Sequence, residues 1–323
     1  MAYSETVLRR AQARLAQAKA DHESEVNARI EATYVQYPRL REIDRAMRQS
    51  VSKAVAVAFR KGCDTTEAIA AIKDENLALQ REREWILEAN DLDESLLENT
   101  PFCPHCSGSG YVGAVMCECL RELCRQEQKK ELSSLLNGKE SFEQFRLDYY
   151  PEEPDAQLGI SPRQLMQNTY QYCRQYARSF SRKSASLLFT GAPGLGKTFL
   201  SACIARSVAD GGFSVVYETA GKLFADFEAV KFSGDQSDLT RKYLECDLLI
   251  IDDLGTEMTT QFTQSALYQV INTRMMEEKP VIISTNLGTD AISHRYAGPI
   301  ASRLLGAFQV CMFLGRDIRQ IQR

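Results

Sequence analysis

The chain has 323 residues and a mass of 36.4 kDa, a length that exceeds one average domain and predicts two. With 44% hydrophobic and 25% charged residues it has the composition of a globular protein, and no run approaches the roughly 18 consecutive apolar residues of a membrane span, so we expect no membrane protein. A net charge of −4 excludes a global attraction to nucleic acid, and any DNA contact must come from a local patch or from several subunits in line.

The first residues, MAYSETVLRR, lack the apolar stretch and the small-residue cleavage site of a signal peptide. We therefore expect a cytoplasmic protein. Thiols stay reduced in that compartment, so the ten cysteines are not expected to form disulfides. Clustered cysteines are predicted to be metal ligands and scattered ones to be small core residues.

The first part of the chain, to about Asn99, has the composition of helices. Pro38 and Gly62 are its only helix breakers, and Ala, Arg, Glu, Gln and Leu dominate it. The apolar residues near the start follow helical spacing with charges between them. This pattern predicts a small helical bundle; a second interpretation reserves one helical face for a partner protein.

Five cysteines lie within 22 residues: Cys103, Cys106, Cys117, Cys119 and Cys124. The first two and the next two form pairs whose spacing permits a tetrahedral zinc site, with glycines between the pairs where the chain must turn back. The one-residue gap in the second pair is tight, so Cys124 is an alternative fourth ligand. His105 is expected to point outward. Four thiolates leave no open position for water, which favours structural over catalytic zinc.

A polar helical stretch then ends at Asn137 and Gly138, and SFEQFRLDYYPEEPD follows with the proline and acidic content of a linker that carries anchoring aromatic residues. We therefore predict a helical, zinc-binding domain at residues 1–138, a linker at 139–160 and a second domain at 161–323.

The second domain alternates helices with short apolar strands. Ser161 and Pro162 resemble an N-cap followed by an N1 proline, and they predict a helix to about Phe180. The alternation predicts an α/β fold with a parallel sheet. Its five expected strands are Ser186–Thr190, Ser214–Glu218, Asp247–Asp252, Val281–Thr285 and Val310–Leu314.

The first of these strands leads into GAPGLGKT, which fits the P-loop pattern and is followed by a helical run. Gly191, Gly194 and Gly196 let the backbone wrap closely around phosphates, so that amide groups and the positive helix end point at them. Lys197 is predicted to reach the terminal phosphates of ATP, and the Thr198 hydroxyl to take a Mg²⁺ position.

The strand DLLII ends in two acids, 55 residues after Lys197, where a Walker B strand delivers carboxylates beside the P-loop. Asp252 is predicted to hold Mg²⁺, directly or through water. Asp253 is predicted to orient or deprotonate the attacking water, with Glu257 as the next candidate for this role.

Polar residues after the later strands complete the predicted site. Asn286, at the end of VIISTN, falls where an amide could position the attacking water beside the γ-phosphate. The tail from His294 to Arg323 carries five arginines, one acid and no lysine. Arginine suits planar, bidentate phosphate recognition, so at least one of the five is predicted to bind phosphate.

Several of these segments together are similar to a known family. GAPGLGKTFL, LLIIDDLG, IISTNL, RYAGPIASRLLG and FLGRDIRQ resemble the bacterial DnaC/DnaI-type helicase loaders, over the span from about Ser141 to the C-terminus. The preceding CPHC and CEC resemble the zinc-binding N-terminal part of DnaI-like and prophage members, more loosely.

This resemblance implies an AAA+ P-loop NTPase core with a five-stranded parallel sheet of order 5-1-4-3-2, preceded by a helical N-terminal domain that grips the helicase. It implies that Asn286 is sensor 1, Arg303 the arginine finger and Arg319 sensor 2. In the initiator clade of the family an extra helical element, here between Tyr217 and Tyr243, contacts single-stranded DNA. Asp253 departs from the general AAA+ pattern, where glutamate is commoner; the shorter side chain suits a switch better than a motor.

The leading hypothesis is an ATP-dependent loader that self-associates through its AAA+ domain and places a hexameric replicative DNA helicase on single-stranded DNA. ATP, Mg²⁺ and Zn²⁺ are its predicted cofactors. A rival is a transposition-helper ATPase of the IstB kind, against which the zinc-bearing helical extension argues. A rival of another class is a DNA-binding adaptor that recognises DNA through its zinc knuckle and uses ATP only for structure.

Overall fold

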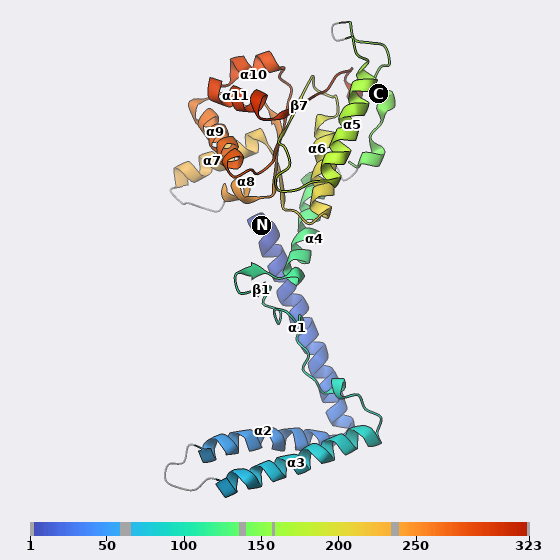
Figure 1. Ribbon diagram of the computed structural model, residues 1–323, viewed down its shortest axis with the longest axis vertical. Coiled ribbons are helices and arrows are strands. Elements are labelled where there is room, and N and C mark those ends of the chain that lie inside the picture. The colour runs from blue at the N-terminus through green and yellow to red at the C-terminus, as the bar shows by residue number, and fades with distance from the viewer. Residues whose placement is uncertain (1–2, 59–65, 136–139, 157–158, 234–238, 322–323) are drawn as a thin grey trace. The chain divides into compact units, whose positions relative to one another are not determined.

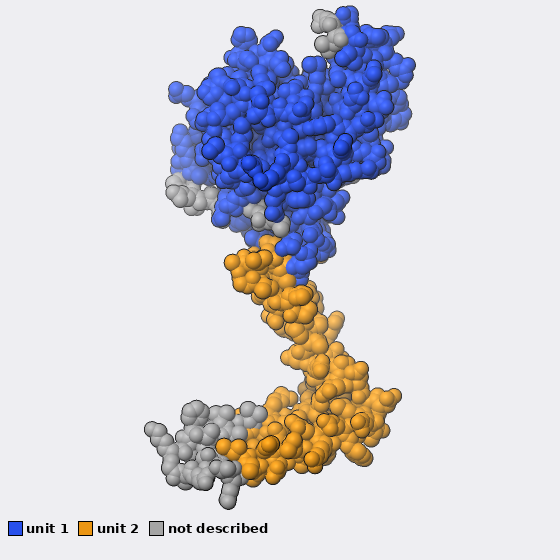
Figure 2. All heavy atoms as spheres, in the orientation of Figure 1, with its two compact units in different colours: residues 1–13, 118–323 blue, residues 14–117 orange. Residues whose placement is uncertain are grey.

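The computed structural model describes residues 3–58, 66–135, 140–156, 159–233 and 239–321 (Figure 1). These fall into two compact units, residues 1–13 with 118–323 and residues 14–117, which Figure 2 colours separately. No helix in the described ranges combines the length and the apolar content that a membrane span requires.

The N-terminal part is helical, as the composition predicts. It contains α1 (Glu5–Gln36), α2 (Pro38–Ala58) and α3 (Thr66–Ala89), and α2 and α3 lie side by side (Figure 1). Pro38 opens α2, where its missing N–H costs no helical hydrogen bond. The helices share an apolar core built by buried side chains of all three: Tyr34, Leu40, Ile43, Ile86 and Leu87.

Short elements connect these helices to the rest of the chain. They are the 3₁₀ turn η1 (Glu94–Leu96), the antiparallel hairpin of β1 (Tyr111–Val112) and β2 (Val115–Met116), helix α4 (Glu118–Leu135), and the 3₁₀ turns η2 (Phe142–Gln144) and η3 (Leu147–Tyr149).

The C-terminal part is built on one parallel sheet. Its strands are β3 (Leu187–Thr190), β4 (Val215–Thr219), β5 (Leu248–Leu254), β6 (Val281–Thr285) and β7 (Gln309–Met312), in the order β4-β5-β6-β3-β7. Read from β7, this is the order 5-1-4-3-2, and all five predicted strands are present. The predicted α/β fold with a five-stranded parallel sheet of this order is confirmed.

Helices cover both faces of this sheet (Figure 1). Along β3, Leu187 and Phe189 join the core beneath one set of helices and Leu188 joins the core beneath the other, as the alternation of a strand requires. The first set contains α5 (Pro162–Arg178) and α6 (Lys197–Asp210). The second contains α7 (Ala220–Ser233), α8 (Arg241–Glu245), α9 (Gln261–Met276), α10 (Thr289–Arg295) and α11 (Gly298–Gly306). A last short helix, α12, spans Ile318–Ile321.

The start of α5 follows the predicted capping. The Ser161 side chain accepts a hydrogen bond from the Gln164 amide, and Pro162 occupies the first turn. The helix ends at Arg178, just before the expected limit near Phe180.

Helix α4 lies in the same compact unit as the sheet. The Gln128 side chain accepts a hydrogen bond from the Val215 amide at 3.0 Å and donates one to the Phe213 carbonyl at 3.0 Å. These two bonds tie α4 to the beginning of the edge strand β4. The predicted domain boundaries at residues 138 and 160 remain a prediction, and the compact units divide the chain earlier, at 117/118.

Candidate nucleotide site and cysteine cluster

The P-loop connects β3 to α6, and its backbone conformation explains two of its glycines. Gly194 has a φ of 75° and Gly196, the residue before α6, a φ of 89°, both in the left-handed region that glycine adopts without strain. A Cβ on Gly194 would lie 1.8 Å from Oδ1 of Asp317. Gly194 is therefore required both by the turn and by the C-terminal segment packed against it.

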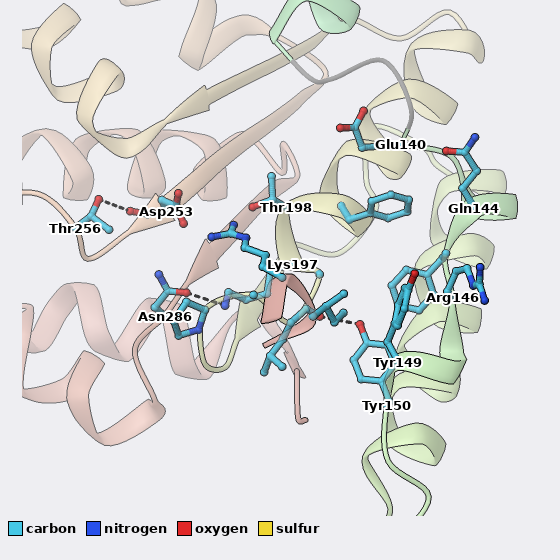
Figure 3. A pocket seen from close by; sticks show the side chains of 18 residues that line it. Glu140, Gln144, Arg146, Tyr149, Tyr150, Lys197, Thr198, Asp253, Thr256 and Asn286 are labelled. Atoms are coloured by element: carbon cyan, nitrogen blue, oxygen red, sulfur yellow. Dashed lines mark hydrogen bonds between the residues drawn. The ribbon is translucent and has the colours of Figure 1, made fainter. Parts of the chain in front are cut away.

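Lys197 is the first residue of α6, directly after the glycines of the loop. Its side chain is nearly buried, and Nζ donates hydrogen bonds to the carbonyls of Gly191 and Ala192, each at 2.7 Å, and to Oδ1 of Asn286 at 2.8 Å (Figure 3). Burial lowers the pKa of Lys197 to about 8, against the opposing charges of Asp253 and Asp252. The structure thus brings the predicted phosphate-binding lysine and the predicted sensor asparagine together.

Asp252 is buried at the end of β5 and is held by hydroxyl groups from three elements. Thr198 Oγ1 donates to Oδ1 at 3.3 Å, Ser284 Oγ donates to the same oxygen, and the Tyr217 hydroxyl donates to Oδ2 at 2.8 Å. Ser201 in turn lies 3.0 Å from the Tyr217 hydroxyl. The carboxylate that sequence analysis assigned to Mg²⁺ therefore adjoins Thr198, the other predicted Mg²⁺ ligand.

Asp253 lines the cavity through an unusual backbone conformation. It has a φ of 54°, and its amide donates to Oδ1 of Asp252 and to Ser284 Oγ, each at 3.1 Å. Burial and the neighbouring Asp252 raise its pKa, against the charges of Lys197 and Arg319. A left-handed conformation is uncommon for a residue other than glycine, and such strain concentrates at functional sites.

Glu257, the alternative catalytic acid, does not line this cavity. Its Oε1 accepts a hydrogen bond from the Tyr296 hydroxyl at 2.6 Å, and its Oε2 accepts one from the Gly255 amide at 2.7 Å. The carboxylate is engaged in the turn after β5, so the geometry favours Asp253 over Glu257.

A cavity of about 480 Å³ opens over the P-loop (Figure 3). Lys197, Thr198, Asp253, Asn286 and Arg319 all line it. Its opposite wall comes from the segment predicted to be a linker with anchoring aromatic residues, and it contains Phe145, Tyr149 and Tyr150.

Tyr150 joins that wall to the P-loop. Its side chain is 1% exposed, and its hydroxyl donates to the Leu195 carbonyl at 2.8 Å. A Cβ on Gly315 would lie 3.2 Å from Cδ1 of its ring. Tyr150 and Tyr217 are the functional candidates that sequence reasoning missed. Their hydrogen bonds to Leu195 and Asp252 join residues that are 45 and 35 positions apart in the sequence. No local motif could therefore predict them.

The two arginines assigned by resemblance lie in different places. Arg319 lines the cavity, where the Ile318 amide bonds the Gly194 carbonyl at 3.0 Å and anchors the segment. Arg303 does not line it. Its guanidinium lies 4.6 Å from the centre of the Tyr268 ring and donates to Oδ1 of Asn272 at 2.7 Å. Within its own chain, Arg303 therefore belongs to a surface formed with α9.

The cysteine cluster contains the four predicted ligands. The sulfur atoms of Cys103, Cys106, Cys117 and Cys119 all lie within 4.8 Å of one another, and those of Cys103 and Cys117 are 3.9 Å apart. Tetrahedral Zn–S bonds of about 2.3 Å place sulfur atoms about 3.8 Å apart, so the four residues fit a zinc ion. Cys124 is not part of this group; its thiol is buried, which raises its pKa to about 11.

Comparison with known proteins agrees with the P-loop geometry. Residues 165–300 match the family model of the IstB-like ATP binding protein. The match covers the P-loop, Asp252, Asp253 and Asn286, and it ends before Arg303 and Arg319.

Curated relatives share part of the same segment. The replicative helicase loader DnaC of Escherichia coli K12 is 25% identical over 139 residues, 42% of this chain and 57% of that protein. DnaC of Buchnera aphidicola subsp. Baizongia pistaciae is 26% identical over 118 residues, 35% of this chain and 48% of that protein. The chain thus spans about half the length of these relatives. A crystal structure of the DnaC helicase loader has 18% identity and a TM-score of 0.44, covering 54% of this chain and 98% of that one.

Proposed function

We propose that this protein is an ATP-dependent loader of a hexameric replicative DNA helicase onto single-stranded DNA. The observation that carries the ATPase part is the convergence of Lys197, Thr198, Asp253, Asn286 and Arg319 on one cavity, with Asp252 held behind Thr198. The similarity of the ATP-binding domain to DnaC proteins supports the choice of the helicase as partner.

The residues divide the work of ATP hydrolysis between them. The P-loop amides and Lys197 bind the phosphates, and Thr198 and Asp252 would hold Mg²⁺, which neutralises charge that develops on the phosphate oxygens. Asp253 and Asn286 orient the attacking water from the two strand ends that flank it. Arg319 adds positive charge from the C-terminal segment. Because phosphoryl transfer is catalysed mainly by positioning and electrostatics, this set is sufficient for slow, controlled hydrolysis.

A further positive charge would come from a second subunit. Arg303 is turned onto Tyr268 and Asn272 within its own chain, outside the cavity. Phosphoryl transfer is accelerated by an arginine that adds positive charge at the γ-phosphate beyond what Lys197 and a bound Mg²⁺ would supply. We therefore assign Arg303 to the ATP of a neighbouring subunit in an assembly formed through the AAA+ domains.

The N-terminal helices and the cysteine cluster form the part of the loader that holds the helicase. Four thiolates would make the zinc structural, because they leave no coordination position for water. Trp85 on α3 is 67% exposed and Val35 on α1 is 74% exposed, and exposed large apolar side chains favour protein contacts.

A second candidate is a transposition-helper ATPase, since the matching family model is that of the IstB-like proteins. A zinc-knuckle DNA-binding adaptor that uses ATP only for structure is a third. The three differ in the partner they hold and in their need for hydrolysis.

Affinity purification of the tagged full chain with bound ATP analogue, followed by mass spectrometry, separates the first two candidates. The proposal expects a replicative helicase among the recovered proteins, and Lys197→Ala serves as the nucleotide-free control. Recovery of a transposase without a helicase would favour the second candidate, a transposition-helper ATPase. DNA binding by the full chain, with no hydrolysis even when DNA and partner are present, would favour the third.

A further inference from the structure

Helix α5 begins a stretch of the chain that carries only positive charge. Between Asp155 and Asp210 there is no acidic residue, although the chain as a whole has a net charge of −4. The same stretch contains seven lysines and arginines. A local basic patch of this kind is what an acidic protein requires to contact nucleic acid.

Most of these seven residues are engaged elsewhere. Arg163 pairs with Glu152, Arg182 with Asp247 and Lys183 with Glu278, while Lys197 lies in the P-loop and Arg206 hydrogen-bonds the Glu140 carbonyl. Arg174 and Arg178 remain, and within the described ranges they form no ion pair.

Arg174 and Arg178 interact electrostatically with one acid, Glu143 in η2. Hydrogen bonds from its own amide and from Ser141 lower the pKa of Glu143, and the two arginines contribute after them. This is a distant interaction that leaves both guanidinium groups available to an anion.

The two arginines lie one helical turn apart, about 6 Å along the axis of α5. Gln171, Gln175 and Ser179 lie with them along an open groove of about 380 Å³. No apolar side chain is among the described residues that line this groove. Most of the lining surface comes from the carbon atoms of these side chains, but both of its charged groups are cationic and no acid lines it. Nucleic-acid interfaces are positively charged, so the charge of the lining fits a phosphate backbone.

We propose that the α5 groove binds the sugar-phosphate backbone of single-stranded DNA; the identity of the strand rests on the function proposed above. Arg174 and Arg178 contact two phosphates through their planar guanidinium groups. Contacts to phosphates do not depend on the base sequence. Gln171 and Gln175 donate amide hydrogen bonds beside them. The groove is thus the local basic patch through which a chain of net negative charge can bind DNA.

A second basic cleft, on α2, differs in this respect. It contains Arg41, Arg45 and Arg48, but Glu31 also lines it and pairs with Arg41. Its charge is partly cancelled within the protein. The exposed pair Arg45 and Arg48 therefore offers a matched control for α5, with the same loss of two charges.

The test measures the affinity of the full chain, with a non-hydrolysable ATP analogue, for a labelled oligothymidylate by fluorescence anisotropy over a series of salt concentrations. The double variant Arg174→Gln/Arg178→Gln should lose on the order of tenfold in affinity, and its slope of log K against log salt should shrink by about 1.4, since each phosphate contact contributes about 0.7. Arg45→Gln/Arg48→Gln should keep the affinity and slope of the unmodified protein. Glutamine and arginine have similar helix propensities, so both helices should persist.

Each of four results would overturn the proposal. An α5 variant with unchanged affinity and slope would remove the groove from DNA binding and leave the loader function standing. Equal losses in both double variants would assign the effect to net charge. An unmodified protein that does not bind the oligonucleotide at all would refute both the groove and the DNA part of the proposed function. Loss of helicase binding with intact DNA binding would give the groove to an acidic protein partner and equally contradict the proposal.

Discussion

Two adjacent carboxylates at the end of β5 have different surroundings, which is why the proposed mechanism gives them different roles. Asp252 is buried and accepts hydrogen bonds from three hydroxyl groups, an environment that fixes a metal ligand. Asp253 faces the cavity with its side chain exposed. Partial desolvation by the surrounding protein and the charge of Asp252 raise its pKa. A carboxylate of this second kind is suited to act on water.

Exchanges at Lys197 and Asp253 should separate nucleotide binding from hydrolysis. Lys197→Ala should abolish or strongly weaken ATP binding, because the lysine neutralises phosphate charge in the ground state. Asp253→Asn should bind ATP normally and hydrolyse it at least about 10²-fold more slowly, as expected for loss of a catalytic base. Fluorescent-nucleotide binding and phosphate release measure the two steps. Normal hydrolysis by Asp253→Asn would remove the assigned role from this residue.

Tyr217 should act as a positioning residue for Asp252. Tyr217→Phe removes the hydroxyl that donates to Oδ2 of Asp252, and loss of such a supporting bond weakens metal binding about 10–100-fold. We expect hydrolysis to need a correspondingly higher Mg²⁺ concentration, with unchanged nucleotide affinity in the absence of Mg²⁺.

Tyr176→Phe provides the control for Tyr217→Phe, because Tyr176 also donates a hydrogen bond from its hydroxyl, to the Ala185 carbonyl at 2.8 Å, and does not line the cavity. Its Mg²⁺ dependence should match that of the unmodified protein. A common shift in both variants would indicate general destabilisation instead of a role at the metal site.

Site residues that are close together in the sequence can be predicted from it, whereas contacts between distant segments cannot. Gly191 to Thr198 form one continuous segment, and Asp252 ends an apolar strand, so local patterns suffice to predict them. The bond from Tyr150 to Leu195 and that from Tyr217 to Asp252 depend on the packing of distant segments. Neither tyrosine differs in its neighbours from an ordinary core aromatic residue, and only the fold gives it a partner.

At the scale of elements, the five strands and α5 follow their predictions within about two residues, because apolar runs and an N-cap mark them directly. The sequence did not predict which part of the chain α4 packs against, because a polar helical stretch does not specify the surface that its apolar side covers. In the structure Gln128 on α4 accepts a hydrogen bond from the backbone of β4. Similarly, composition indicated a linker at 139–160, and its aromatic residues pack against the P-loop as a wall of the cavity.

The cysteine cluster predicts one zinc ion per chain. Metal analysis of the freshly reduced protein should find about one equivalent, because structural thiolate sites bind tightly at neutral pH. Exchange of Cys103 or Cys117 for serine should remove the metal and loosen the segment around it. Cys124→Ser, outside the cluster, should retain it. Less than half an equivalent in the unmodified protein, or zinc loss in Cys124→Ser alone, would contradict the assignment.

At the scale of the whole molecule, the role proposed for Arg303 predicts that the active species is an oligomer. Arg303→Ala should leave ATP binding near normal and reduce hydrolysis by a factor on the order of 10³, as for other arginine fingers. Arg303 is half-buried and donates hydrogen bonds to Tyr268 and Asn272 of α9. A typical hydrogen bond contributes about 1 kcal/mol to stability, so the monomer should remain folded.

A mixture of inactive subunits tests this assignment. Lys197→Ala subunits supply an intact Arg303, and Arg303→Ala subunits supply an intact P-loop, so mixed assemblies should regain hydrolysis. Differently tagged subunits verify that the two variants assemble together. Persistent inactivity in verified mixed assemblies would place the arginine outside the shared site.

In the proposed function, ATP held by this P-loop governs the placement of a helicase on DNA. The most direct measurement is the amount of the partner hexameric helicase retained on circular single-stranded DNA after removal of free protein. With the unmodified chain and ATP, retention should rise well above that of the helicase alone, and Lys197→Ala should eliminate the increase. Equal retention with and without the chain, or an undiminished increase with Lys197→Ala, would contradict the account.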